Sequence, residues 1–76
     1  MNILDQVIQT VADTLNLPAS SIKENSSADN IDIWDSLAQV NLMIAIEQIF
    51  DIQLEVEDFI GLTSVKTITT FIENNS

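Results

Sequence analysis

The stretch from Asp35 to Asp51 reads DSLAQVNLMIAIEQIFD, and it decides how the rest of the chain is interpreted. Its aliphatic residues recur at helical spacing, and no glycine or proline interrupts them, so it predicts one continuous helix over residues 36–50. Asp35 and Ser36 open this helix as a capping pair, a role in which their side chains accept hydrogen bonds from unpaired amides of the first turn.

This predicted helix carries two apolar stripes rather than one, because successive residues are turned by about 100°. The stripe assigned to the core consists of Leu42, Met43, Ile46, Ile49 and Phe50. The stripe on nearly the opposite side consists of Leu37, Val40 and Ile44. A helix in a small bundle normally buries one stripe, so the second is expected to face solvent or a partner. The alternative is that the first helix and the loop wrap this helix and bury both stripes.

The segment before this helix divides into another helix and a long loop. Residues 2–16 predict an amphipathic helix with apolar residues at helical spacing, ended near Asn16 because Pro18 cannot continue it. Residues 17–34 lose that periodicity and predict a loop, which is unusually long for so short a domain and therefore a candidate for function. The apolar residues expected to hold the loop against the helices are Leu17, Ile22, Ile31 and Ile33.

The segment after the central helix predicts two more helices. Residues 56–60 form a short helix that Gly61 stops as a C-terminal cap. A last helix over residues 65–73 is capped by Thr63 or Ser64. Residues 1–76 are therefore expected to form one all-α domain, a small bundle of three main helices plus one short helix.

Composition narrows the possible functions. Twelve carboxylates face only Lys23 and Lys66, giving a net charge of −10, which argues against nucleic acid or anionic lipid as a partner and favours basic protein surfaces. Histidine, cysteine, tyrosine and arginine are absent, so an enzyme is not expected. Asp29, Asp32 and Asp35 do not form a calcium-loop pattern, and no metal site is expected. No apolar run could insert into a membrane and no signal-peptide pattern is visible, so we expect a cytoplasmic protein.

The start of the central helix suits one particular modification. A phosphodiester on Ser36 would lie against free N–H groups and the positive end of the helix dipole, a placement that favours an anion by about 0.3–1 kcal/mol. The loop before Ser36 would leave its hydroxyl exposed to a modifying enzyme. Asp-Ser pairs before apolar helices are nevertheless usually only caps.

The same helix resembles the attachment-site helix of acyl carrier proteins. The residues that carry the resemblance are Asp35-Ser36-Leu37, Val40, Leu42, Ala45, Glu47 and Phe50-Asp51. The mid-chain position of this motif, the long loop, the short third helix and the acidity extend the resemblance over essentially the whole chain. It implies that a phosphopantetheinyl transferase attaches 4′-phosphopantetheine from coenzyme A to Ser36, and that the arm's thiol carries an acyl or aminoacyl group as a thioester.

The resemblance also implies roles for residues around Ser36. The expected partner-binding residues are Asp35, Leu37, Val40, Ile44 and Glu47. The expected lining of an acyl cavity is Met43, Ile46, Phe50, Leu54, Phe59 and Leu62. The implied partners, besides the transferase, are acyl-loading and acyl-processing enzymes with basic or apolar docking surfaces, and a monomeric carrier is expected.

Departures from the family's pattern point away from primary fatty-acid synthesis. Ala38, Asn41 and Gln48 stand where the family often has carboxylates, and Trp34 occupies a commonly small position. Trp34 is expected to pack on the bundle, and the alternatives are that it covers the base of the arm or contacts a partner. We therefore favour a dedicated carrier in a specialised pathway, with polyketide, modified-sugar, lipid and aminoacyl transfer as the candidates.

Other interpretations stay open at this point. An aminoacyl or D-alanyl-type carrier would share the same motif. A non-carrier helical interaction module would use the outer stripe only to dock another protein. A small carboxylate-dependent enzyme would need two coupled acids in a pocket, and the spacing of the acidic residues indicates no such pair.

Overall fold

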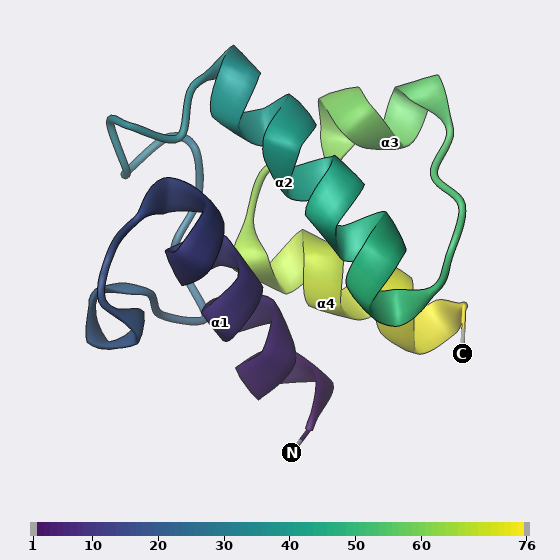
Figure 1. The fold of residues 1–76 in the computed structure, drawn as a ribbon, viewed down its shortest axis with the longest axis horizontal. Helices are drawn as coiled ribbons and strands as arrows, with labels where there is room; N and C mark the ends of the chain where they lie inside the picture. The colour runs from purple at the N-terminus through teal and green to yellow at the C-terminus, as the bar shows by residue number, and fades with distance from the viewer. Residues whose placement is uncertain (1, 76) are drawn as a thin grey trace.

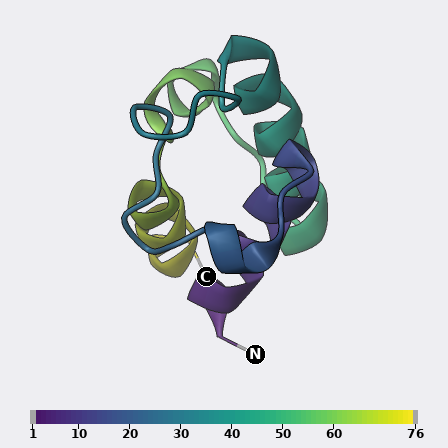
Figure 2. The ribbon, with the colours of Figure 1, turned by 90° about the vertical axis from the view of Figure 1, so that its left-hand side faces the viewer.

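The computed structural model describes residues 2–75 and is built from α-helices and one short 3₁₀ helix (Figure 1). The elements along the chain are α1 (Ile3–Leu15), η1 (Ala19–Ser21), α2 (Ser36–Phe50), α3 (Val56–Gly61) and α4 (Val65–Asn74). α1 packs against both α2 and α4, whereas α3 contacts α2. Viewed from the side, α1 and α2 lie opposite α3 and α4 (Figure 2). The predicted all-α bundle of three main helices and one short helix is confirmed, and η1 is an addition inside the predicted loop.

The core is formed where the inward stripes of the three longer helices meet. The side chains that are completely buried there are Val7, Val11, Ala12, Leu42, Met43, Ile46, Val65 and Ile68. Burying a large aliphatic side chain contributes about 1.5–3 kcal/mol each, so this cluster supplies most of the drive for helix packing. The described residues therefore form a bundle around one apolar centre.

Ile49 corrects the predicted core stripe of α2. Its side chain is 56% exposed, while Leu42, Met43 and Ile46 are fully buried. Ile49 lies at the edge of the buried stripe and in the last turn of the helix. The buried stripe instead includes Gln39. The positions of the apolar residues alone do not predict the burial of this polar side chain.

The helix ends also differ in part from expectation. Gly61 is the last residue of α3 rather than a left-handed cap, and Leu62 follows it with a φ of −88°. The Leu62 amide donates to the Asp58 carbonyl at 3.0 Å, so the chain leaves the helix without needing a positive φ. The left-handed positions are Asn16 and Asp51, which follow α1 and α2 with φ values of 58° and 54°.

The loop between α1 and α2 is tied to the bundle by two buried side chains and a backbone bridge. Ile22 and Trp34 are buried. Ile33, which was expected to help hold the loop, is 49% exposed because it lies in a turn just before Trp34 enters the core. The Ala28 amide donates to the Thr63 carbonyl, and the Val65 amide donates to the Ser26 carbonyl, each at 2.9 Å. These bonds fasten the middle of the loop to the start of α4.

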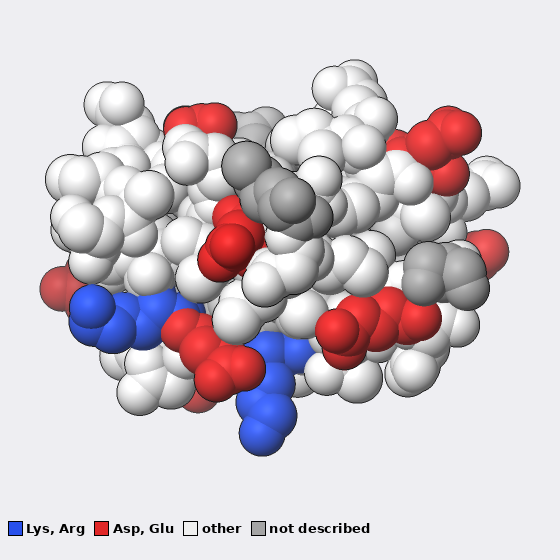
Figure 3. Space-filling view, turned by 90° about the horizontal axis from the view of Figure 1, so that it is seen from below, with Lys and Arg blue, Asp and Glu red and all other residues white. Residues whose placement is uncertain are grey.

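The few positive charges are grouped, whereas the carboxylates are spread over the surface. Lys23 and Lys66 line one shallow hollow together with Glu24 and Asn25. Both lysines are visible from below (Figure 3), whereas α2 begins at the top of Figure 1. The start of α2 therefore lies away from these two cations. Within residues 2–75, no helix has the length and apolar character needed to cross a bilayer.

The net charge of −10 predicts that salt stabilises the fold, because mutual repulsion of carboxylates opposes the compact state. Raising NaCl from about 0.01 M to about 0.5 M shortens the range of this repulsion. We expect the melting temperature to rise by about 4 °C or more, equivalent to about 1 kcal/mol for a domain of this size. Circular dichroism would measure it. The Asp29→Asn, Asp32→Asn double variant should show a smaller rise, and a melting temperature unaffected by salt would contradict the expectation.

Candidate functional site

Ser36 occupies the first position of α2 and is exposed to solvent. Asp35 alone is the N-cap, since its Oδ1 accepts a hydrogen bond from the Ala38 amide at 2.9 Å. The sequence assigned capping to both residues, and the structure divides their roles. Because Asp35 performs the capping, the Ser36 hydroxyl is available for other chemistry at the positive end of the helix dipole.

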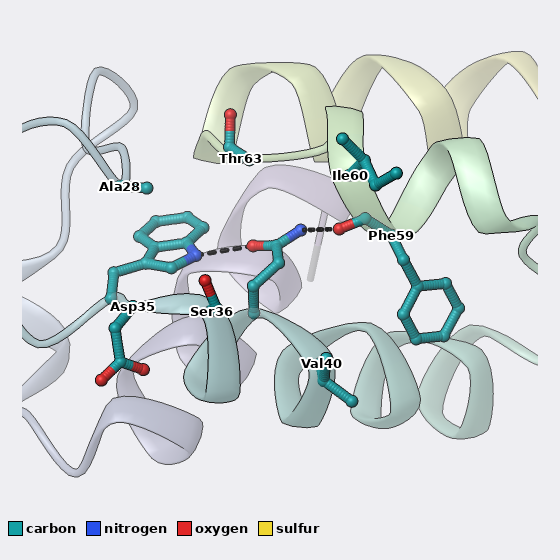
Figure 4. A pocket seen from close by; sticks show the side chains of 9 residues that line it. Ala28, Asp35, Ser36, Val40, Phe59, Ile60 and Thr63 are labelled. Carbon is teal, nitrogen blue, oxygen red and sulfur yellow. Dashed lines mark hydrogen bonds between the residues drawn. The ribbon is translucent and has the colours of Figure 1, made fainter.

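A hollow of about 460 Å³ lies beside Ser36, between the loop, α2 and α3 (Figure 4). Its lining residues are Ala28, Trp34, Asp35, Ser36, Gln39, Val40, Phe59, Ile60 and Thr63. Most of this lining is apolar, with a few polar groups among it, which is the composition of sites that hold small organic groups. A group attached to Ser36 would therefore start at the wall of a concave, mostly apolar surface.

Gln39 connects the segments that surround this hollow. Its Oε1 accepts a hydrogen bond from Trp34 Nε1 at 2.7 Å. Its Nε2 donates to the carbonyls of Leu62 at 2.8 Å and Phe59 at 3.2 Å. Figure 4 shows the amide between the indole ring on one side and the end of α3 on the other. We call this set of three hydrogen bonds the Gln39 network.

The Gln39 network is costly to break, because its members are buried. Trp34 and Gln39 are only 2% and 7% exposed. A typical hydrogen bond contributes about 0.5–1.5 kcal/mol, but a buried group left without a partner costs about 1–3 kcal/mol. The network therefore holds Trp34 in place and fixes the distance between α2 and the C-terminal end of α3.

Polar bonds matter for α3 because this helix has no buried residue. Besides Gln39 at its far end, Glu47 anchors the segment that leads into α3, where its Oε2 accepts from the Leu54 amide at 2.9 Å. At the start of α3, the Glu55 amide donates to Asp58 Oδ2 at 2.9 Å. Glu47, which the sequence placed on the partner-binding surface, is half-buried and has this structural contact.

The remaining predicted partner-binding residues lie on the exposed side of α2. Leu37, Val40 and Ile44 are 71%, 43% and 42% exposed, and we call these three residues the outer face. The alternative in which both apolar stripes of this helix are buried is therefore wrong. Asp35, which directly precedes the N-terminal end of α2, is also exposed. On neighbouring α3, Ile60 is also highly exposed and lines the hollow together with Val40.

The residues predicted to line an acyl cavity are only partly at the hollow. Phe59 lines it, whereas Met43 and Ile46 are completely buried in the core. Leu54 and Leu62 are also buried, and Phe50 is half-buried against the core. The prediction missed Ala28, Trp34, Gln39 and Thr63 as lining residues. The signal for Gln39 was its position one turn before Met43 on the buried stripe, where a polar residue needs buried partners.

The described part of the chain holds no group of three or more histidine, cysteine or carboxylate side chains arranged to bind a metal ion. The polar side chains that line the hollow, besides the Trp34 indole, are two hydroxyls from Ser36 and Thr63, the Asp35 carboxylate and the Gln39 amide.

Comparison with known protein families adds one match. The family model described as "Phosphopantetheine attachment site" matches residues 5–72, which is most of the chain. The matched range contains the start of α2, the hollow and the whole outer face.

The Gln39 network predicts a large effect of one substitution on stability. Gln39→Ala should lower the free energy of unfolding by about 2–4 kcal/mol, because buried groups of Trp34, Phe59 and Leu62 lose their partner. Urea denaturation followed by circular dichroism would measure the change. Gln48→Ala, on the exposed side of the same helix, is the matched control and should change stability by about 0.5 kcal/mol or less. Equal stabilities of the two variants would show that the network does not contribute.

Proposed function

This chain belongs to the phosphopantetheine attachment-site family, and we propose that Ser36 is the residue that bears its prosthetic group. Members of this family carry covalently attached 4′-phosphopantetheine, so the resemblance to phosphopantetheine-dependent carriers and the cofactor class are both confirmed. The chain is a phosphopantetheine-carrying carrier protein, and carrier domains of this kind are generally not catalytic.

The observation that supports Ser36 most directly is its exposure at the first position of α2, where Asp35 has taken over the capping bond. In the proposed reaction, Ser36 Oγ attacks the phosphorus of coenzyme A that bears the pantetheine arm. A phosphodiester forms, the pyrophosphate bond breaks, and the adenosine-containing phosphate leaves. The hydroxyl proton passes to a base of the transferase, which is consistent with the absence of histidine from this chain.

The proposed function is to hold an intermediate as a thioester on the arm and present it to successive enzymes. Tethering raises the effective concentration of the carried group at each active site. The absence of carboxylates at Ala38, Asn41 and Gln48 supports a dedicated pathway rather than primary fatty-acid synthesis. An aminoacyl or D-alanyl-type carrier is the alternative cargo class, while the family match disfavours a non-carrier interaction module. We propose a monomer without enzymatic activity that works in the cytoplasm.

The outer face is the proposed docking surface for the transferase and for acyl-loading and acyl-processing enzymes. Leu37, Val40 and Ile44 expose aliphatic surface beside Ser36, and exposed Asp35 adds negative charge. Apolar groups at the centre of an interface supply most of its affinity, while charges steer the encounter. A partner with an apolar patch surrounded by basic residues fits this surface.

Modification tests the attachment site. Incubation with coenzyme A and a broad-specificity phosphopantetheinyl transferase should increase the mass of the chain by one phosphopantetheine group, measured by intact-protein mass spectrometry. Ser36→Ala should abolish the gain without unfolding the protein, because Ser36 has no capping bond. Ser20→Ala, which removes an exposed serine from η1, is the matched control and should be modified normally. A mass gain that persists in Ser36→Ala would place the attachment elsewhere.

A pair of isoleucines on α2 tests the docking surface. Ile44→Asp should slow modification by the transferase about tenfold or more, which corresponds to a loss of about 1.4 kcal/mol. Ile49→Asp introduces the same change on the same helix but outside the outer face, at a residue that is also about half exposed, and it should leave the rate nearly unchanged. Initial rates are measured under conditions limited by carrier concentration, after circular dichroism has shown both variants folded. Equal rates for the two variants would contradict the proposed surface.

A further inference from the structure

Gln39 lies between Ser36 and the apolar core. It follows Ser36 by one turn of α2 and precedes Met43 by another, so the three residues share one side of the helix. Gln39 lines the hollow, whereas Met43 and Ile46, which lie farther along α2, are completely buried and do not line it. A group attached to Ser36 that moved between α2 and α3 towards the core would have to pass this amide.

The amide closes that route with hydrogen bonds rather than with bulk alone. Its Nε2 reaches from α2 to the carbonyls of Phe59 and Leu62 at the end of α3. Its Oε1 is occupied by the Trp34 indole N–H from the other side of the hollow. An alkyl chain has no donor or acceptor that could replace these bonds, so its entry would leave several buried polar groups without partners.

We propose that Gln39, held by Trp34, is the specificity-determining residue of this carrier and restricts its cargo to short acyl groups that remain in the hollow beside Ser36. The inference rests on the proposed attachment of the arm to Ser36. The Gln39 side chain then sets how far a carried group can extend from Ser36 towards the core. A long unbranched acyl group fits poorly, because its distal methylenes would stay in water.

The test compares two carried groups on otherwise identical proteins. Butyryl and octanoyl pantetheine arms are installed from the corresponding acyl coenzyme A compounds, and mass spectrometry confirms loading. The rate of thioester cleavage by hydroxylamine then reports how well the carried group is sheltered. The wild-type protein is compared with Gln39→Met, which replaces the amide by an apolar chain of similar volume. Thr69→Val is the matched control, because it removes a buried hydroxyl hydrogen bond within α4 that does not border the hollow.

In the wild type and in Thr69→Val, we expect the butyryl and octanoyl thioesters to be cleaved at similar rates. In Gln39→Met, the octanoyl thioester should be cleaved about tenfold more slowly than the butyryl one, because its additional methylenes gain shelter between α2 and α3. The fluorescence of Trp34, the only tryptophan, provides a second readout in the wild type and in Gln39→Met. Its emission maximum should differ between the butyryl and octanoyl forms only in Gln39→Met. If Gln39→Met does not fold, Trp34→Phe takes its place, because it keeps an aromatic ring but lacks the indole donor. In Trp34→Phe, the ratio of the butyryl to the octanoyl cleavage rate should be higher than in the wild type.

Two results would overturn the inference. Stronger protection of octanoyl than of butyryl in the wild type would mean that long chains already pass Gln39. Unchanged rate ratios in both Gln39→Met and Trp34→Phe would mean that the network does not set the depth of the site. Failure of loading in the wild type is a separate result, because a missing mass gain rejects the proposed attachment at Ser36 before cargo is compared.

Discussion

A single buried amide holds together the part of the structure in which the attachment site is proposed. Gln39 accepts from the loop through Trp34 and donates to two carbonyls at the end of α3. α3 has no fully buried residue, and of its apolar side chains only the half-buried Phe59 packs against the core, so apolar packing alone does not position this helix. The shape of the hollow beside Ser36 therefore depends on these three hydrogen bonds, whereas the packing of α1, α2 and α4 depends on the aliphatic core.

At the start of α2, one residue stabilises the helix and its neighbour provides the reactive hydroxyl. Asp35 satisfies an unpaired amide of the first turn, so the neighbouring hydroxyl has no structural duty. The same separation occurs around the helix. Leu42, Met43 and Ile46 are buried on one side, while Leu37, Val40 and Ile44 remain exposed on the other. A carrier needs both properties, since its fold must persist while one helix presents a reactive residue and an apolar surface to other proteins.

Periodicity in the sequence was sufficient to predict the all-α bundle and the exposure of the outer face. Periodicity was insufficient to predict side-chain burial and helix ends that depend on contacts with other segments of the fold. Ile49 matches the apolar pattern but lies at the edge of the buried stripe. Gly61 permits a left-handed cap, yet the chain leaves α3 through Leu62 without one. In the sequence Gln39 resembles an ordinary polar helix residue, because two of its three partners, the carbonyls of Phe59 and Leu62, lie 20 and 23 residues away and are brought to it only by folding.

The backbone hydrogen bonds between the loop and the start of α4 determine when the loop that leads to Ser36 is completed during synthesis. Residues 26–28 find their hydrogen-bonding partners at residues 63–65, which leave the ribosome almost forty residues later. The path of the loop that leads to Ser36 is thus completed only when the last helix is available. A nascent chain would expose the serine before the loop has reached its final path, so an enzyme that recognises the folded surface would act only after residues 63–65 have been synthesised and paired.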